Sequence, residues 1–142
     1  MRARRIVLVG ATVLAAAFML LQLVPVERTN PPVTGDVEAP PAVAAVLRRA
    51  CYDCHSNETR WPWYARVAPV SWLVARDVRE ARAELNFSTW DETTARERLE
   101  VRREVWEEVE DEHMPPWFYL PLHPGARLSD ADRDVLRDWA GR

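Results

Sequence analysis

Residues 51–55, CYDCH, contain both cysteines of the chain and one of its three histidines. Near a helix end, cysteines three residues apart lie on neighbouring faces, and the residue after the second cysteine can project its imidazole beside them. Two such thiols can form thioether bonds with the vinyl groups of a porphyrin while the imidazole binds its iron. The C-x-x-C-H spacing of Cys51, Cys54 and His55 therefore predicts covalent attachment of one c-type haem.

Two other kinds of site use the same residue types. A thioredoxin-like C-x-x-C motif is expected after a β-strand, whereas residues 42–50, directly before Cys51, have a helical pattern. A zinc site would need a fourth ligand, and the remaining histidines, His113 and His123, are distant in sequence and not spaced as a ligand pair. The sequence favours haem over both alternatives.

A haem iron has a sixth position, for which a methionine thioether is one possible ligand. Met1 begins the chain and Met19 lies in an apolar N-terminal run, so Met114 is the only methionine of the predicted domain. A lone methionine often fills a core, but two prolines follow Met114 and would stiffen a loop that presents its sulfur. Met114 is therefore the predicted distal ligand, and His113 and His123 are the alternatives.

Aromatic and basic side chains near the motif are candidates to contact the cofactor. Arg60, Trp61 and Tyr64 follow the motif closely and could donate hydrogen bonds to haem propionates, although these rings could also simply pack in the core. For Trp63 and Trp72 we expect core packing. Three aromatic residues near the distal methionine are expected to shield its sulfur from water and so to raise the potential: Trp117, Phe118 and Tyr119.

The N-terminal segment has the pattern of a membrane anchor. Arg2, Arg4 and Arg5 precede an apolar run at 6–24, which as a helix would span about 28 Å, close to the hydrocarbon thickness of a bilayer. Positive charge before the run favours a cytoplasmic N-terminus and export of the rest. We expect an uncleaved single-pass anchor in a bacterial inner membrane, with the haem domain on the periplasmic side. A cleaved signal peptide is the alternative, although no small-residue cleavage site follows.

The 142 residues are enough for one small domain behind this anchor. The predicted divisions are an anchor at 1–24, a proline-rich linker at 25–41 and a haem domain at 42–142. Prolines favour extended conformations, so the linker is expected to lift the domain off the membrane. The formal net charge of −3 gives no electrostatic reason to expect nucleic-acid binding.

Hydrophobic periodicity after the linker is helical throughout, with no sustained strand alternation. Four helices are predicted: 42–50, 70–85, 93–112, and a last helix that Ser129 caps and Gly141 ends. Asn86 and Ser88 are expected to end the second helix and cap the next element. The predicted core faces contain Val43, Val46, Leu47, Trp72, Leu73, Ala75, Val78, Ala81, Leu99, Val105, Trp106, Val109, Val135, Leu136 and Trp139. The predicted fold class is all-α.

This order of helix, C-x-x-C-H, further helices, methionine loop and terminal helix resembles that of class I cytochromes c. The chain resembles more closely the haem-binding domain family of small, membrane-anchored bacterial proteins. The resemblance rests on TNPPVTG, CYDCHSNETRWPWY, APVSWLVARDV, LNFSTW and MPPWFYLPLHPGARLSD, and covers nearly everything after the apolar run. It implies a cytochrome c-like helical domain with haem on Cys51, Cys54 and His55 and with Met114 as distal ligand. It implies no particular reaction or partner.

Two strong axial ligands leave no open iron position, so we expect a membrane-tethered, single-haem electron carrier and not an enzyme. Its partners would be redox proteins that dock transiently. The alternative is a haem-based ligand sensor or a peroxidase-like enzyme, which needs an open sixth position; a third is a structural protein whose haem stabilises the fold. Five acidic residues could face a basic partner, but a solvated helix face also explains them: Glu107, Glu108, Glu110, Asp111 and Glu112.

Overall fold

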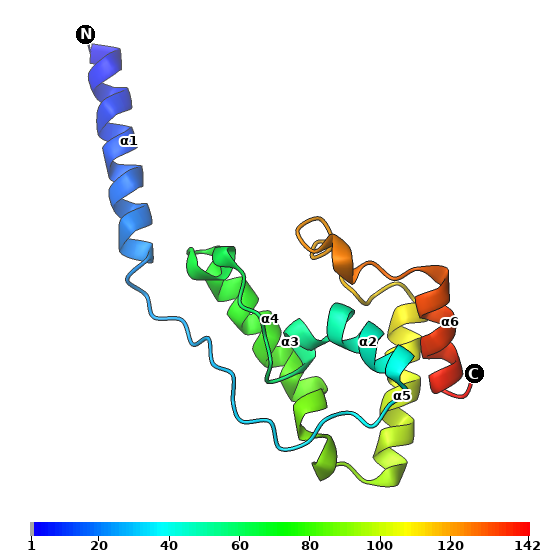
Figure 1. Cartoon of the computed structure of the whole chain (residues 1–142). Coiled ribbons are helices and arrows are strands. Elements are labelled where there is room, and N and C mark those ends of the chain that lie inside the picture. The colour runs from blue at the N-terminus through cyan, green and yellow to red at the C-terminus, as the bar shows by residue number, and fades with distance from the viewer. Residues whose placement is uncertain (1) are drawn as a thin grey trace. The chain divides into compact units, whose positions relative to one another are not determined.

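The computed structural model describes residues 2–142, and in this part of the chain every regular element is a helix. The predicted all-α fold class is therefore confirmed. Short 3-10 helices at Trp63–Arg66, Phe87–Glu92 and Pro124–Ala126 lie between the α-helices. The α-helices in Figure 1 are α1 (Arg2–Leu21), α2 (Pro41–Ala50), α3 (Tyr52–His55), α4 (Val70–Glu84), α5 (Ala95–Glu110) and α6 (Asp130–Trp139).

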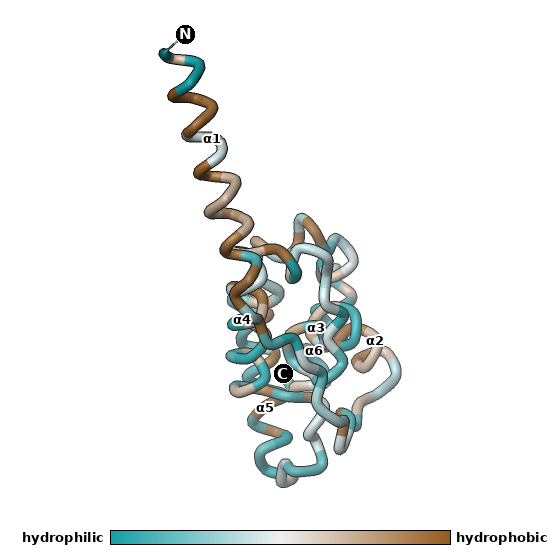
Figure 2. Tube along the Cα trace, turned by 90° about the vertical axis from the view of Figure 1, so that its left-hand side faces the viewer, coloured by the Kyte–Doolittle hydropathy of each residue, from teal (hydrophilic) through white to brown (hydrophobic). Residues whose placement is uncertain are grey.

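Helix α1 has 20 residues, none of them buried, and it is long and apolar enough to cross a membrane. Figure 2 shows hydrophobic residues over most of its length after a hydrophilic start. The helix ends at Leu21, earlier than the end of the predicted run at 6–24. After Leu21 the amides of three residues bond to carbonyls only three positions back, as in a tightening last turn: Gln22, Leu23 and Val24.

The chain divides into two compact units. The first contains the chain up to Arg28 together with Trp61–Asp77. Within it the Gln22 side chain donates to the Ala68 carbonyl at 3.3 Å and accepts from the Ala68 amide at 2.9 Å, which ties the end of the apolar segment to the second stretch of the unit. The second unit contains Thr29–Arg60 and Val78–Arg142, and so holds the C-x-x-C-H motif and Met114.

The proline-rich segment has no regular secondary structure at 25–40 (Figure 1). From Thr29 onward it belongs to the second unit and bonds to other parts of that unit. The amides of Thr34 and Gly35 donate to the Ser88 carbonyl at 3.0 and 3.1 Å. A Cβ at Gly35 would lie 2.8 Å from the backbone nitrogen of Asp91 and would also overlap the Asp91 side chain, so this close approach requires glycine. The second unit starts at Thr29. The domain start at 42 and the linker role of 25–41 stay predictions. The composition indicated an extended chain but not this set of backbone contacts.

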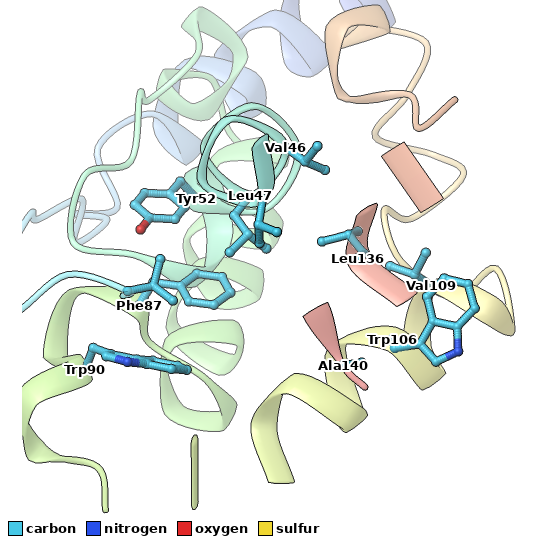
Figure 3. Packing of buried hydrophobic residues seen from close by; sticks show 11 residues of the cluster. Val46, Leu47, Tyr52, Phe87, Trp90, Trp106, Val109, Leu136 and Ala140 are labelled. Atoms are coloured by element: carbon cyan, nitrogen blue, oxygen red, sulfur yellow. The ribbon is translucent and has the colours of Figure 1, made fainter. Parts of the chain in front are cut away.

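One hydrophobic cluster forms the core of the second unit (Figure 3). Helix α2 buries Val43, Val46 and Leu47, which confirms its predicted face. Leu47 projects between the stacked rings of Tyr52 and Phe87, whose centroids are 5.3 Å apart, and Leu136 of α6. Further buried members come from α5, the residue directly after α6, the proline-rich segment and the 3-10 helix after α4: Trp106, Val109, Ala140, Val37 and Trp90.

Two predicted core positions are wrong. Leu99 is 55% exposed and Leu73 is also exposed, whereas Trp106 and Val109 are buried as predicted. Leu99 lies seven residues before Trp106, on the same side of α5, but only the later part of this helix reaches the core. Periodicity identified the apolar face of the helix but not the length over which the face is covered.

Capping residues define where the last two helices begin. Thr94 caps α5 and Ser129 caps α6, each in a reciprocal capping box with an acidic residue three positions later. In the second box the Ser129 hydroxyl accepts from the Asp132 amide at 3.2 Å, and the Asp132 carboxylate accepts from the Ser129 amide at 2.8 Å. Gly141 follows α6 with a φ of +75°. The predicted cap and end of the last helix are confirmed.

We expect Leu47→Ala to lower the free energy of unfolding by about 2–5 kcal/mol, because the fully buried side chain would leave a cavity in the main cluster. The matched control is Leu99→Ala in the uncovered part of the apolar face of α5, which should cost less than about 0.5 kcal/mol. Denaturant unfolding followed by circular dichroism measures both. Equal costs for the two variants would contradict the core described here.

Candidate functional site

The C-x-x-C-H motif lies where α2 ends and the single turn of α3 begins. Cys51 is the last residue bonded into α2, through its amide to the Leu47 carbonyl at 2.8 Å. The Cys51 carbonyl in turn accepts from the amides of Cys54 and His55 at 3.1 and 2.9 Å. Both sulfur-bearing residues and the imidazole are therefore held on one helical turn, and the cysteines are not joined in a disulfide.

The ring of His55 is oriented by the backbone after α4. Its Nδ1 atom lies 3.2 Å from the Leu85 carbonyl oxygen. A carbonyl oxygen can only accept, so Nδ1 carries the proton and Nε2 keeps its lone pair. Burial lowers the pKa of His55. Hydrogen bonds to backbone carbonyls and the charges of nearby carboxylates act in the opposite direction and raise it, but less strongly. His55 is thus an oriented imidazole whose unprotonated Nε2 could bind a metal, the arrangement in which iron-binding histidines occur.

The thiol of Cys51 packs against the main hydrophobic cluster. Burial, with a smaller contribution from neighbouring Cys54, raises the pKa of Cys51 to about 12. A thioredoxin-like nucleophile has a depressed pKa and an electropositive setting, which is the opposite environment. Among residues 2–142, moreover, no three His, Cys, Asp or Glu side chains are grouped so that they could hold a metal ion, as a zinc site would require.

Arg82 of α4 fastens the chain around the motif. Its Nε donates to the carbonyl of Ser56, the residue after His55, at 2.7 Å. Its terminal nitrogens donate to the Thr29 carbonyl, the Asn30 side chain and the Thr59 hydroxyl at 2.9, 3.0 and 2.8 Å. Burial lowers the pKa of this arginine. One guanidinium therefore joins the extended segment to the loop that follows the motif.

Arg60 lies beside the motif but is paired within the protein. Its backbone amide and its Nε donate to Asp53, between the two cysteines, at 3.1 and 3.2 Å. The hydrogen bond and the charge of Asp53 raise the pKa of Arg60. The guanidinium remains largely exposed, and its role at a haem propionate stays a prediction.

The other aromatic candidates behave differently from one another. Trp61 and Tyr64 belong to the first compact unit, and their predicted role at the haem stays a prediction. Trp63 packs edge-on against Tyr64 with ring centroids 5.8 Å apart, but it is 75% exposed, so the expectation that it fills the core is wrong. Trp72 is partly buried. The aromatic side chains of residues 61–72 suggested a buried segment, but the structure leaves Trp63 at the surface.

Met114 is held at the end of α5. Glu112 adopts a φ of +60°, and the amides of His113 and Met114 then both donate to the Glu108 carbonyl at 3.0 Å. The Glu108 carboxylate lies near enough to His55 to act on its pKa. Met114 itself is partly buried.

The alternative distal ligands already have protein contacts. His113 is exposed, with Nδ1 3.5 Å from the Glu108 carboxylate. His123 has Nδ1 3.2 Å from the Tyr119 carbonyl, and its ring stacks on that of Tyr119 with centroids 3.8 Å apart. No described contact joins Met114 to the motif, so the choice of distal ligand stays a prediction.

The predicted aromatic cover of Met114 is only partly present. Trp117 is 80% exposed and Phe118 is also exposed, the two rings meeting edge-on with centroids 5.9 Å apart. The expectation that these two rings form a dry shield is therefore wrong. Tyr119 is partly buried, and its hydroxyl donates to Asp53 at 3.1 Å. Sequence reasoning missed this contact, because the two residues are 66 positions apart and neither carries a signal for the other.

An all-helical domain that presents two thiols and an oriented imidazole on one turn has the donor set of a haem-binding protein. The family model described as a haem-binding domain matches residues 16–142 of this chain. The chain belongs to this haem-binding domain family, as the sequence resemblance indicated. No curated protein and no solved structure matched the chain.

Proposed function

We propose that this haem-binding protein is a membrane-tethered c-type cytochrome that carries single electrons. The observation that carries the proposal is the hydrogen bond from His55 Nδ1 to Leu85, because it prepares Nε2 as an iron ligand inside a C-x-x-C-H motif. The residues present fit covalent haem, since Cys51 and Cys54 lie at the two ends of one helical turn and both are free thiols.

Each side chain has a defined part in this proposal. The thiols of Cys51 and Cys54 would hold the haem through two thioether bonds, each formed by addition of S–H across one vinyl group. The imidazole of His55 and the thioether of Met114 would be the protein ligands of the iron. Bound haem supplies a one-electron Fe(III)/Fe(II) couple. Cys51, which packs against the main cluster, and His55 are both partly buried, which would limit the access of water on this side of the site.

Helix α1 supports a tethered location. Its length, its apolar composition and its arginine-rich start favour a single span of a bacterial inner membrane, with the haem domain on the periplasmic side. Anchored there, the domain would exchange electrons with redox proteins that dock transiently near the haem edge. We propose an anchor that is retained in the mature protein and not cleaved as a signal peptide.

Carbon monoxide binding by the reduced wild-type protein tests the electron-carrier function. An electron carrier with both axial positions filled should be reduced and reoxidised quickly by small redox mediators, while its reduced spectrum stays nearly unchanged under carbon monoxide. The measurement is the absorption spectrum of the full chain in detergent, before and after the gas is added. Rapid, complete formation of the carbon monoxide complex would instead support a ligand sensor or a peroxidase-like enzyme.

A further inference from the structure

A hydrogen bond joins the methionine loop to the haem motif across 66 residues of sequence. The Tyr119 hydroxyl donates to Oδ2 of Asp53 at 3.1 Å. Asp53 is one of the two residues between Cys51 and Cys54, and its side chain is only 17% exposed. A bond to a carboxylate that is largely shielded from water is stronger than one at an open surface.

The acceptor side of this bond is rigid. Asp53 lies in the single turn of α3, and its other oxygen accepts from the backbone amide and from Nε of Arg60 at 3.1 and 3.2 Å. The carboxylate is thus held in one orientation by two donors from the same residue. Oδ2 is thereby turned to the Tyr119 hydroxyl, with one longer contact of 3.4 Å to the Arg60 guanidinium.

The donor side is a loop held by its own backbone hydrogen bonds. From Pro116 to His123 the amides of Tyr119, Leu122 and His123 bond to carbonyls three residues earlier, at 3.0, 3.3 and 3.2 Å. The Tyr119 ring also stacks on the His123 ring. At the start of the loop, the Met114 amide is bonded to Glu108. A restraint on Tyr119 is therefore a restraint on the whole segment that carries Met114.

We propose that Tyr119 and Asp53 form a latch that positions Met114 over the iron and sets how often Met114 leaves it. This inference rests on the proposed function, because it takes Met114 as the distal ligand. Tyr119 and Asp53 act as positioning residues, since neither is a ligand. When the latch opens, the loop loses its fixed point on the motif turn, and an external ligand can compete for the position of the sulfur.

Tyr119→Phe tests the latch in the full-length haem protein, because it removes one hydroxyl and keeps the ring that stacks on His123. We expect the reduced variant to bind carbon monoxide about tenfold faster than the wild type, as expected for loss of one hydrogen bond to a charged group. We expect the weak far-red methionine-to-iron band of the oxidised protein to decrease, with unchanged covalent haem content. A purely structural role would lower the melting temperature without these two changes.

Tyr52→Phe is the matched control. Its hydroxyl also donates to a carboxylate, that of Asp36 in the proline-rich segment, and not to the methionine loop. We expect it to lose stability without faster carbon monoxide binding. Asp53→Ala should reproduce the effect of Tyr119→Phe, and the double variant should bind carbon monoxide no faster than Asp53→Ala alone. Asp138→Ala, at an exposed position of α6, controls for loss of a charge.

The outcomes separate the latch from the function on which it rests. If the wild type holds covalent haem and shows the far-red band, but Tyr119→Phe binds carbon monoxide at the wild-type rate, the latch is overturned and the cytochrome assignment stands. If Tyr52→Phe gives the same acceleration, the effect is a general loss of stability and the latch is again overturned. If the wild type lacks covalent haem, the proposed function and the latch fail together.

Discussion

Replacing both cysteines, Cys51→Ala with Cys54→Ala, is expected to release the haem into acid acetone, whereas the wild-type protein should retain it. Acid protonates His55 and breaks its bond to iron, so only thioether bonds can hold the porphyrin on an unfolded chain. The measurement is the haem absorbance of the protein pellet after extraction. Retention of haem by the double variant would refute covalent attachment at this motif.

The single variants provide an internal control. Cys51→Ala and Cys54→Ala should each keep the haem through one remaining thioether, with a shifted α band in the alkaline pyridine spectrum. That shift arises because one vinyl group stays conjugated with the porphyrin. Complete loss of haem from either single variant would mean that the protein fails to fold or to be loaded, and circular dichroism of the helices separates these causes.

Met114→Ala is expected to lower the midpoint potential and to open the reduced iron to carbon monoxide. A neutral thioether favours Fe(II), so its loss should shift the potential by a sizeable part of the about 0.8 V range that axial ligands span. The far-red band should also disappear. Redox titration and the carbon monoxide difference spectrum measure these effects.

Three further variants test whether another residue is the distal ligand: one is a control and two remove the alternative histidines. Met19→Ala in α1 is the matched control, since it removes the other methionine of the described chain and should leave the spectrum unchanged. His113→Ala and His123→Ala should also leave it unchanged. An unaltered potential in Met114→Ala, together with a large change in either histidine variant, would assign the distal position to that histidine.

The helical core was predictable because its signals are local. Val43, Val46 and Leu47 repeat at helical spacing, and Ser129 with Asp132 forms a capping box that can be read within four residues. Leu99 shows the limit of this reasoning. Its spacing is correct for the apolar face of α5, but burial depends on the extent of a neighbouring element, and no local pattern encodes that extent.

The proline-rich segment shows a different limit. Its extended conformation follows from proline, but its attachment depends on backbone carbonyls such as that of Ser88 and on the Arg82 guanidinium, which are far away in sequence. The proline content predicted a spacer, but it could not reveal the backbone hydrogen bonds to Ser88 or the close approach at Gly35.

Some features of the candidate site could be predicted from local sequence, and others depend on the fold. Cys51, Cys54 and His55 were predictable as a haem motif because covalent attachment would demand those residue types at that spacing. The carbonyl of Leu85 that orients His55 has no side-chain signature, so a sequence pattern cannot reveal it. The bond from Tyr119 to Asp53 joins two individually ordinary residues and becomes visible only when the fold brings them together.

The mass of the intact wild-type chain in denaturing acid tests covalent haem attachment most directly. Purification from cells that attach c-type haem, followed by mass spectrometry under these conditions, removes any haem held only by His55 or by packing. We expect a single species whose mass exceeds that of the polypeptide by one haem. The bare mass of the polypeptide, with free haem eluting separately, would contradict the account.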